Sequence, residues 1–487
     1  MRWRGLVLLA GLVVPLLLTL ARPVNFDEAN FLMLAAGAAA DPWRPHDTLV
    51  NWQGTTERAF DVLSNPPGIA WWLAPLVAAP AWLQRASMLP WFALATWGAA
   101  LLGGRFGRSG LEGAPFLLTA PIVLLSTTAL LPDMPLYACV LAGVGGYVSR
   151  LDAGRSAWPF ALLAGLAACF RYSGLAVIPL LFLYAWLHRR PLWPALAALL
   201  PMALLALHDL HAYGAWHFLA MGKFQSVSNG PADLAHKAAA MVAMLGGAAA
   251  LPVFAWRVPA LIGAGLGALI ALPFGGVAAL FGALGGAALS GLAGERERAD
   301  RLFLTGWALL GVAFLLALRF TATRYWLPFL PPLLLAMPAT WPRLRVSLGL
   351  SLGALLLLDD AFHARATADL AARAAATGVG RFVGHWGWQH TLEEAGWTAL
   401  DEGSDPAAGT LVAVPRQAWP QAVEVHCNQV VFSGQADPPL PWLPRGYSEA
   451  ASANLHANWI AGRPPARTVI PWWFATDPYE SARVCAE

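Results

Sequence analysis

The sequence contains little charge. Only 12% of its 487 residues are Asp, Glu, Lys or Arg, whereas 58% are hydrophobic, and the mean hydropathy is +0.54. Because a soluble domain usually carries about twice that share of charge, this composition excludes an ordinary soluble protein. The net charge of +3 gives no reason to expect a nucleic-acid partner.

Cysteine is also scarce, with four residues in the chain. Cys139 and Cys169 lie in apolar stretches, where we expect inert core residues. Cys427 and Cys485 lie in the more polar C-terminal part, and they could pair if that part lies outside the cytoplasm. The sequence shows no internal repeat and no low-complexity tract.

Long apolar runs occupy most of the chain from Gly5 to Leu358. Many approach the roughly 20 residues that a helix needs to cross hydrocarbon. Long runs, rather than short alternating segments, indicate a polytopic helical membrane protein and not a β-barrel. The first run follows Arg2 and Arg4 as in a signal peptide, but its small-residue cleavage pattern is poor, so we interpret it as an uncleaved span.

Arginine clusters between these runs predict the topology, because cytoplasmic loops are enriched in basic residues. The clusters are Arg2/Arg4, Arg105/Arg108, Arg150/Arg155, Arg189/Arg190, Arg257, Arg296/Arg298/Arg301 and Arg343/Arg345. Their placement in the cytoplasm predicts about 13 spans, at 5–21, 87–104, 115–131, 136–149, 158–170, 173–187, 192–207, 237–256, 259–274, 276–293, 302–318, 326–340 and 346–358. The outer side then receives 22–65, 132–135, 171–172, 208–236, 319–325 and 359–487.

One apolar stretch, 66–83, disturbs this alternation. It is apolar enough to cross the membrane, yet a full crossing there reverses every later loop. An interfacial or re-entrant segment, or a different break near Gln84 and Arg85, stays open. In the preceding loop, 31–40 predicts a short amphipathic helix along the membrane surface.

The composition becomes more polar from residue 359 onward. Patterning predicts strands at 381–384 and 410–415 and a short helix at 388–395. We therefore predict a mainly α protein with two parts, a transmembrane domain over 1–358 and a small extracytoplasmic α/β domain over 359–487.

Two adjacent carboxylates, Asp27 and Glu28, directly follow the first span. Charge at a bilayer is costly and therefore suggests a function, either as a general base or as a cation ligand. A pair of acids favoured by the dipole at a helix N-terminus explains them equally well. Asp133, in a minimal outer loop, is either a helix cap or a third acid that converges with Asp27.

Two Arg-Tyr pairs, Arg171-Tyr172 and Arg324-Tyr325, also fall on the outer side. An arginine that interrupts an apolar run must find an anion, such as a carboxylate or a phosphate. The guanidinium fork suits phosphate, although Arg324 could also be an interfacial residue whose charge reaches water. Together with the acids, these pairs indicate group transfer from a lipid phosphate.

The order of these motifs resembles that of the GT-C superfamily of integral-membrane glycosyltransferases. Within it, the motifs resemble those of the family 39-like group, which includes protein O-mannosyltransferases and lipid A aminoarabinose transferases. The resemblance covers about residues 1–358 and rests on Asp27-Glu28-Ala29, Pro66-Pro67 with Trp71-Trp72, Asp133-Met134-Pro135-Leu136, Arg171-Tyr172, Trp216-His217-Phe218 and the run from Arg324-Tyr325 to Pro331-Pro332.

This resemblance implies a polyprenyl-phosphate sugar donor and an inverting displacement on the outer face of a bacterial-type inner membrane. The acceptor would be a hydroxyl of a lipid, a glycan or a protein. Asp27 would be the catalytic base, Glu28 would orient it or the acceptor, and Asp133 would support the acceptor side or a cation. The leaving phosphate would be held by Arg171, Tyr172, Arg324 and Tyr325.

One position departs from the family pattern. Many relatives carry Lys before the Pro-Pro pair, whereas this chain has Asn65, and Arg58 or Arg171 could supply the missing cation. His217, in the long outer loop, is a further candidate. No cofactor is firmly implied. A divalent metal stays open but is not predicted, and His385 and His390 of the C-terminal part are too few for a metal site.

Two other functions are compatible with the sequence. A transporter or flippase for a lipid or amphiphile would line a path with these charges, but such proteins usually show related halves. A non-catalytic polysaccharide-assembly protein could retain the same scaffold. The presence of Asp27 argues against a non-catalytic protein, whereas Asn65 in place of lysine argues for one.

Overall fold

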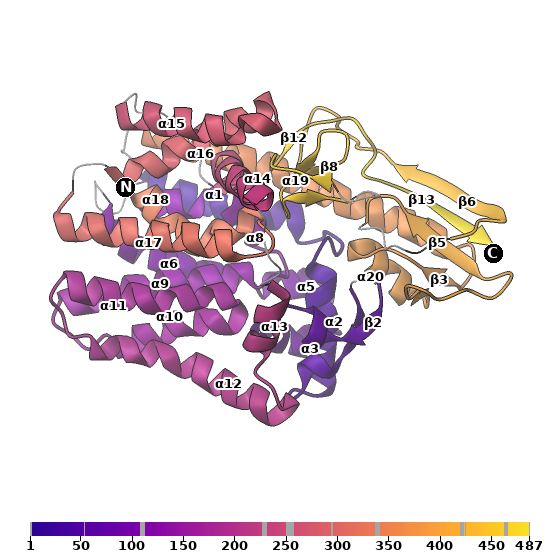
Figure 1. Ribbon diagram of the computed structural model, residues 1–487, viewed down its shortest axis with the longest axis horizontal. Helices are drawn as coiled ribbons and strands as arrows, with labels where there is room; N and C mark the ends of the chain where they lie inside the picture. Colours follow the sequence, from indigo (N-terminus) through magenta and orange to yellow (C-terminus); the bar gives the residue numbers. More distant parts are fainter. Residues whose placement is uncertain are drawn as a thin grey trace.

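The computed structural model describes residues 2–52, 54–107, 113–225, 231–249, 258–293, 296–336, 341–418, 423, 425–461 and 466–486. Arg108 and Arg257 of the predicted cytoplasmic clusters lie outside these residues, as do the ends of the predicted spans 237–256 and 326–340. Helices fill one end of the molecule, and the C-terminal strands lie at the other (Figure 1).

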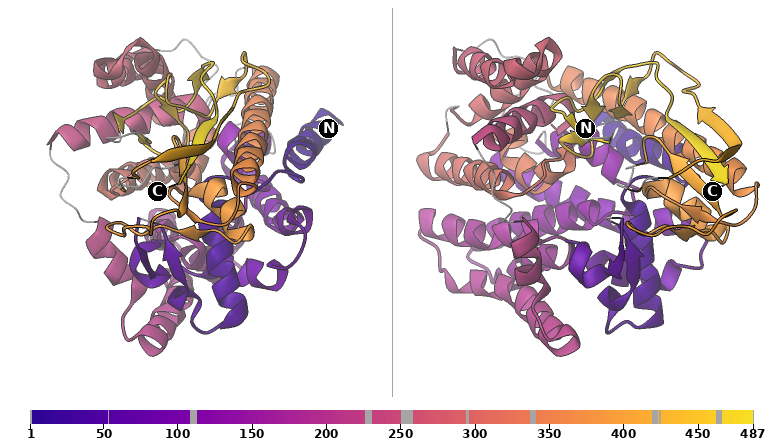
Figure 2. Two further views of the ribbon diagram at one scale, coloured as in Figure 1. Left: turned by 90° about the vertical axis from the view of Figure 1, so that its right-hand side faces the viewer. Right: turned by 45° about the vertical axis from the view of Figure 1, so that its right-hand side comes forward.

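The helical part is a bundle whose longer helices run roughly along the long axis (Figures 1 and 2). The longer helices are α1 (Arg2–Thr19), α6 (Leu89–Phe106), α9 (Asp133–Asp152), α10 (Trp158–Phe170), α11 (Val177–Leu187), α12 (Leu200–Tyr213), α14 (Pro231–Met244), α15 (Val258–Ala271), α16 (Gly276–Ser290), α17 (Arg298–Ala317) and α19 (Pro342–Ala375). The remaining helices are α2 (Glu28–Ala40), α3 (Ala59–Val62), α4 (Gly68–Leu73), α5 (Ala81–Ala86), α7 (Gly113–Leu118), α8 (Pro121–Ser126), α13 (His217–Gln225), α18 (Leu330–Ala336) and α20 (Trp386–Glu394).

Small residues let these helices pack closely. A Cβ added at Gly98 of α6 would lie 2.2 Å from the backbone nitrogen of Ala142 in α9, and one at Gly143 would lie 2.5 Å from Ala164 in α10. Glycine at such contacts lets backbones approach, as membrane helices require. The α9 helix is consequently buried along almost its whole length.

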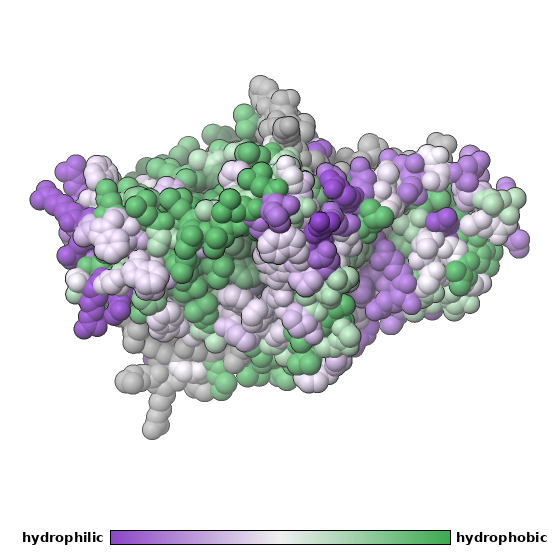
Figure 3. Space-filling view, turned by 90° about the horizontal axis from the view of Figure 1, so that it is seen from below, coloured by the Kyte–Doolittle hydropathy of each residue, from purple (hydrophilic) through white to green (hydrophobic). Residues whose placement is uncertain are grey.

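Four helical stretches among the described residues are long and apolar enough to cross a membrane: Ala81–Phe106, Trp193–Tyr213, Arg298–Ala317 and Pro342–Ala375. The predicted number of about 13 spans is therefore not confirmed. Several predicted spans are broken instead; 115–131 forms α7 and α8 with an interruption before Pro121, where the ring cannot continue the preceding helix. Seen from below, a broad apolar surface covers the bundle, with hydrophilic residues at its ends (Figure 3).

The stretch 66–83 forms no continuous helix. It folds into α4, a 3₁₀ turn (Ala74–Leu76) and, after Pro80, the start of α5. The predicted helix at 31–40 is present as α2, which begins three residues earlier at Glu28. Its side chains Phe31, Leu34 and Ala35 are buried, and α2 packs against α4.

The C-terminal region contains a five-stranded sheet in the order β4-β3-β5-β13-β6. Its strands are β3 (Arg381–Phe382), β4 (Thr398–Ala399), β5 (Leu411–Pro415), β6 (Gln429–Ala436) and β13 (Glu480–Ala486). β3 and β5 confirm the two predicted strands, and α20 confirms the predicted helix. A disulfide joins Cys427 to Cys485 of β13.

Small two-stranded ribbons complete this region. They are β7 (Pro444–Arg445) with β12 (Trp473–Phe474), β8 (Tyr447–Ser448) with β9 (Ala453–Asn454), and β10 (Trp459–Ile460) with β11 (Ala466–Arg467). A further ribbon, β1 (Leu49–Asn51) with β2 (Thr56–Arg58), belongs to the loop 22–65. The predicted domain boundary at 358/359 falls inside α19, a single 34-residue helix. Residues such as Leu370 and Ala374 of α19 pack in one cluster with Phe382 and Trp388, so the last part of α19 belongs to the core of the C-terminal region.

Candidate functional site

A cavity of about 560 Å³ lies where the loop 22–65, the start of α9, the end of α17 and the C-terminal region meet. Seven of the predicted site residues line it: Asp27, Asn65, Asp133, Arg171, Tyr172, Arg324 and Tyr325. The other three, Glu28, Arg58 and His217, lie outside its lining. The remaining polar side chains include Asn30, Arg319, Asn454 and His456, and apolar ones include Phe218, Met221, Phe314 and Phe320.

Asp27 is the N-cap residue of α2, but its side chain makes no capping hydrogen bond. Its carboxylate instead accepts a hydrogen bond from Nη2 of Arg324. The preceding residue, Phe26, has a φ of +43°, a conformation that non-glycine residues adopt at a cost. Asp27 is thus turned toward the cavity, where its side chain is 25% exposed.

Asp133 begins α9 and is almost completely buried. One carboxylate oxygen, Oδ1, accepts a hydrogen bond from Arg171. The other, Oδ2, lies 3.9 Å from Nε of Arg324 and has no hydrogen-bond partner among the described residues. Asp133 therefore lies between the two arginines.

The two arginines lie at different interruptions of the helical bundle. Arg171 lies between α10 and the 3₁₀ segment η4 (Tyr172–Ala176), and Arg324 lies in the first turn of η9 (Thr323–Phe329). Their guanidinium carbons lie 4.4 Å and 5.7 Å from the centre of the Tyr325 ring, close enough for cation–π attraction. We call Asp27, Asp133, Arg171 and Arg324 the cavity cluster, in which carboxylates and guanidinium groups alternate.

Arg324 is buried and only partly satisfied. Burial lowers its pKa, but the carboxylates of Asp27 and Asp133 outweigh this effect and raise it, so the guanidinium stays charged. Its Nε and Nη1 atoms have no hydrogen-bond partner among the described residues. Because buried donors are nearly always paired, these two atoms make Arg324 the arginine of the site whose hydrogen bonding is incomplete.

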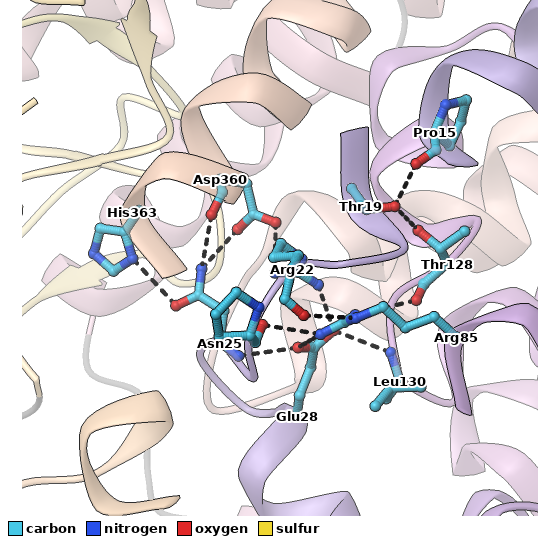
Figure 4. A network of polar contacts seen from close by, with 11 residues as sticks. Pro15, Thr19, Arg22, Asn25, Glu28, Arg85, Thr128, Leu130, Asp360 and His363 are labelled. Carbon is cyan, nitrogen blue, oxygen red and sulfur yellow. Dashed lines mark hydrogen bonds and ion pairs between the residues drawn. The ribbon is translucent and has the colours of Figure 1, made fainter. Parts of the chain in front are cut away.

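Glu28 lies in a separate network of polar contacts with Arg22, Asn25 and Arg85 (Figure 4). Its carboxylate binds Arg22 at 2.5 Å and Arg85 at 2.8 Å, and it accepts hydrogen bonds from the backbone nitrogens of Asn25 and Leu130. Burial would raise the pKa of Glu28, but the two guanidinium groups dominate and lower it to about 2. Glu28 therefore holds the chain on both sides of Asp27 in place.

The network around Glu28 continues to α19. Arg22 also pairs with Asp360 at 2.6 Å, and the side chain of Asn25 donates a hydrogen bond to the same carboxylate at 2.8 Å. Sequence reasoning assigned no role to Arg22, Arg85 or Asp360. The only signal was that Gln84 and Arg85 interrupt an apolar stretch.

His217 lies behind Tyr172, with its Nδ1 atom 2.7 Å from the phenol oxygen. Its ring is 4.5 Å from that of His46, whose Nε2 lies 3.1 Å from the carbonyl oxygen of Asn65. Burial lowers the pKa of His217 to about 4 and that of His46 to about 3. These neutral histidines hold Tyr172 and Asn65 in the wall of the cavity.

Arg58 points to the surface instead. Its side chain is 48% exposed and pairs with Asp61 at 3.1 Å and Asp47 at 3.6 Å. Arg319 does line the cavity, which therefore has a third arginine in its wall besides Arg171 and Arg324. Within the described parts of the chain, no group of three or more His, Cys, Asp or Glu residues is arranged to hold a metal ion.

Two solved structures are similar to this chain. They are ArnT from Cupriavidus metallidurans bound to undecaprenyl phosphate, with a TM-score of 0.44, and the same protein in the apo state, with a TM-score of 0.41. Each is 16% identical, and the match covers 85% of this chain and 93% of the ArnT chain. No protein-family model matches the chain, and no curated protein does.

Proposed function

We propose that this protein is a membrane glycosyltransferase that moves a sugar from a polyprenyl-phosphate donor to an acceptor hydroxyl. The observation that carries the proposal is the cavity cluster, in which a buried arginine with two unpartnered donors contacts a carboxylate at a membrane-protein cavity. Such a site can hold a phosphate and remove a proton side by side.

Arg324 and Arg171 would bind the donor phosphate. Nε and Nη1 of Arg324 are buried without a hydrogen-bond partner among the described residues, and a shift of the side chain on donor binding would turn them toward phosphate oxygens. Charge-assisted bonds of this kind are roughly twice as strong as neutral ones. Phe218, Met221, Phe314 and Phe320 would face the first isoprene units. Tyr172 and Tyr325 would flank the phosphate. Arg319 would supply the positive charge that many relatives have as a lysine at the position of Asn65.

Asp27 would act as the general base. Its carboxylate takes the proton of the acceptor hydroxyl while the oxygen attacks the anomeric carbon from the face opposite the phosphate. The bond between that carbon and the phosphate oxygen breaks, and its electron pair leaves with the polyprenyl phosphate. This displacement inverts the anomeric centre, and the enzyme contributes mainly by positioning the reactants and stabilising phosphate charge.

Asp133 and Glu28 would support this chemistry without taking the proton. Asp133, 1% exposed, orients both arginines. Glu28 orients Asp27 through the chain on either side of it. The disulfide between Cys427 and Cys485 supports an outer-face location for the C-terminal region, because such bonds persist in oxidising compartments.

Transfer from a radiolabelled polyprenyl-phosphate sugar by the purified protein in lipid tests the proposal. Asp27→Asn should abolish transfer, a loss of about 10²–10⁴-fold, while the protein stays folded in the membrane. Asp61→Asn, which changes an exposed carboxylate of the same loop, is the matched control and should retain activity. Transfer by Asp27→Asn at the rate of the unmodified protein would contradict the assigned base.

A further inference from the structure

A loop of the C-terminal region forms part of the cavity wall. The loop 454–458 connects β9 to β10, and its residues Asn454, His456 and Ala457 line the cavity. Asn454 shapes it, because its side-chain oxygen accepts hydrogen bonds from the backbone nitrogens of His456, at 2.8 Å, and Ala457, at 3.3 Å. The loop therefore has a defined conformation at the site.

One side of this loop contacts the segment that leads into Arg324. The backbone nitrogen of Thr321 donates to Oδ1 of Asn458 at 2.9 Å, and that of Thr323 donates to the carbonyl of Leu455 at 3.2 Å. Thr321 and Thr323 are fully buried. The backbone that carries Arg324 thus takes its position from loop 454–458.

The other side contacts Phe26, the residue before Asp27. The centre of the His456 ring lies 4.0 Å from that of Phe26, and His363 stacks on Phe26 at 4.8 Å. Trp386 meets the same ring edge-on at 5.0 Å. These contacts hold Phe26 at its positive φ, and the φ of Phe26 decides where Asp27 points.

We propose that loop 454–458 is an active-site element that positions both members of the Asp27–Arg324 pair, with His456 acting through Phe26 and Asn458 acting through Thr321. This inference rests on the proposed function and gives the C-terminal region a role in it. Burial, then the charge of Arg324, lowers the pKa of His456, so its ring packs on Phe26 uncharged near neutral pH. Both are positioning residues, since they act through other groups.

The two halves of the loop should change different kinetic constants. Asn458→Ala should raise the KM for the polyprenyl-phosphate sugar about fivefold, the effect of one lost hydrogen bond, because Arg324 binds the phosphate. It should weaken binding of undecaprenyl phosphate by the same factor. His456→Ala should lower kcat about tenfold at nearly unchanged KM, because Asp27 is misplaced.

Conservative variants provide the rescue. Asn458→Asp keeps the acceptor oxygen and His456→Phe keeps the ring, so each should recover most of the lost activity. Trp397→Phe is the matched control: it removes one buried hydrogen bond of the C-terminal region, from Trp397 to the carbonyl of Gly378 at 2.9 Å. It should lower the melting temperature and leave both constants unchanged.

The outcomes separate the two claims. If the unmodified protein binds undecaprenyl phosphate and transfers sugar while both alanine variants keep wild-type KM and kcat, loop 454–458 is not a positioning element. The same holds if the alanine variants change these constants only as Trp397→Phe does. Absence of both binding and transfer in the unmodified protein would instead contradict the proposed function, and the inference with it.

Discussion

The bundle carries two clusters of arginines and acids, one at each end of the same helices. Asp133 begins α9 and Asp152 ends it, so the rise of a 20-residue helix separates the clusters by about 30 Å. The second, which we call the brace cluster, consists of Arg105, Asp152, His188 and Asp300. Arg105 donates to Asp152 through Nε and to Asp300 through Nη1 and Nη2, at 2.7 to 2.9 Å.

The two clusters differ in how many hydrogen-bond donors of their arginines have a partner. In the brace cluster every donor atom of Arg105 meets a carboxylate oxygen, and His188 and Tyr184 complete the shell at 2.9 Å and 2.7 Å. In the cavity cluster Arg324 keeps two unpartnered donors beside a 560 Å³ space. The same residue types therefore fasten helices at one end and form a candidate phosphate site at the other.

The largest expected effect comes from Arg324→Ala. Loss of the phosphate-binding guanidinium should lower kcat/KM for the donor by about 10²–10³-fold, with the donor KM rising more than the acceptor KM. Arg105→Ala is the control from the brace cluster. It should reduce stability by about 1–3 kcal/mol, because it leaves carboxylates unpaired, and the remaining folded protein should keep its donor KM. An unchanged donor KM for Arg324→Ala would remove the distinction between the clusters.

Glu28→Gln should give the next largest effect, on stability. The change leaves Arg85 buried without its acid and Arg22 with Asp360 alone, and it should cost about 3 kcal/mol. Glu28 has a pKa of about 2 in the folded state against an ordinary value of 4.5, so its contribution is present above about pH 4.5 and is lost as the pH falls toward 2. Melting temperatures between pH 6 and pH 3 should therefore fall more steeply for the unmodified protein than for Glu28→Gln. Equal slopes would contradict the assigned charge state.

Arg58→Ala should have the smallest effect. Its ion pairs with Asp47 and Asp61 are exposed, and such pairs contribute about 0–1 kcal/mol. Sugar transfer and the donor KM should match those of the unmodified protein. A clear rise in donor KM would mean that Arg58 replaces the lysine that Asn65 displaces, and the cavity cluster would then be incomplete as described.

The convergence of the cavity cluster could be anticipated from the sequence. Asp27, Asp133, Arg171 and Arg324 each interrupt or follow an apolar run, and the arginine distribution placed all four on one side. The adjacent Glu28 behaves differently because successive residues in a helix point about 100° apart. When Asp27 faces the cavity at the start of α2, Glu28 faces Arg22 and Arg85 instead.

Other features depend on contacts that no local pattern reveals. His456 and Phe26 are 430 positions apart, and neither lies in a motif that predicts the other. The number of spans is not confirmed, for a related reason: apolarity marks a buried segment, but prolines such as Pro121 and Pro328 lie where buried segments divide into short helices. Burial inside the protein and burial in lipid require the same residue types.

The most direct test of the cavity cluster is a binding comparison between undecaprenyl phosphate and undecaprenol, which has the same chain without the phosphate. The unmodified protein should bind the phosphate form at least about tenfold more tightly, since each charge-assisted hydrogen bond contributes about 1.5–3 kcal/mol. In Arg324→Ala this preference should disappear, whereas Arg105→Ala should retain it. Equal affinity for both lipids in the unmodified protein, or an undiminished preference in Arg324→Ala, would contradict the account.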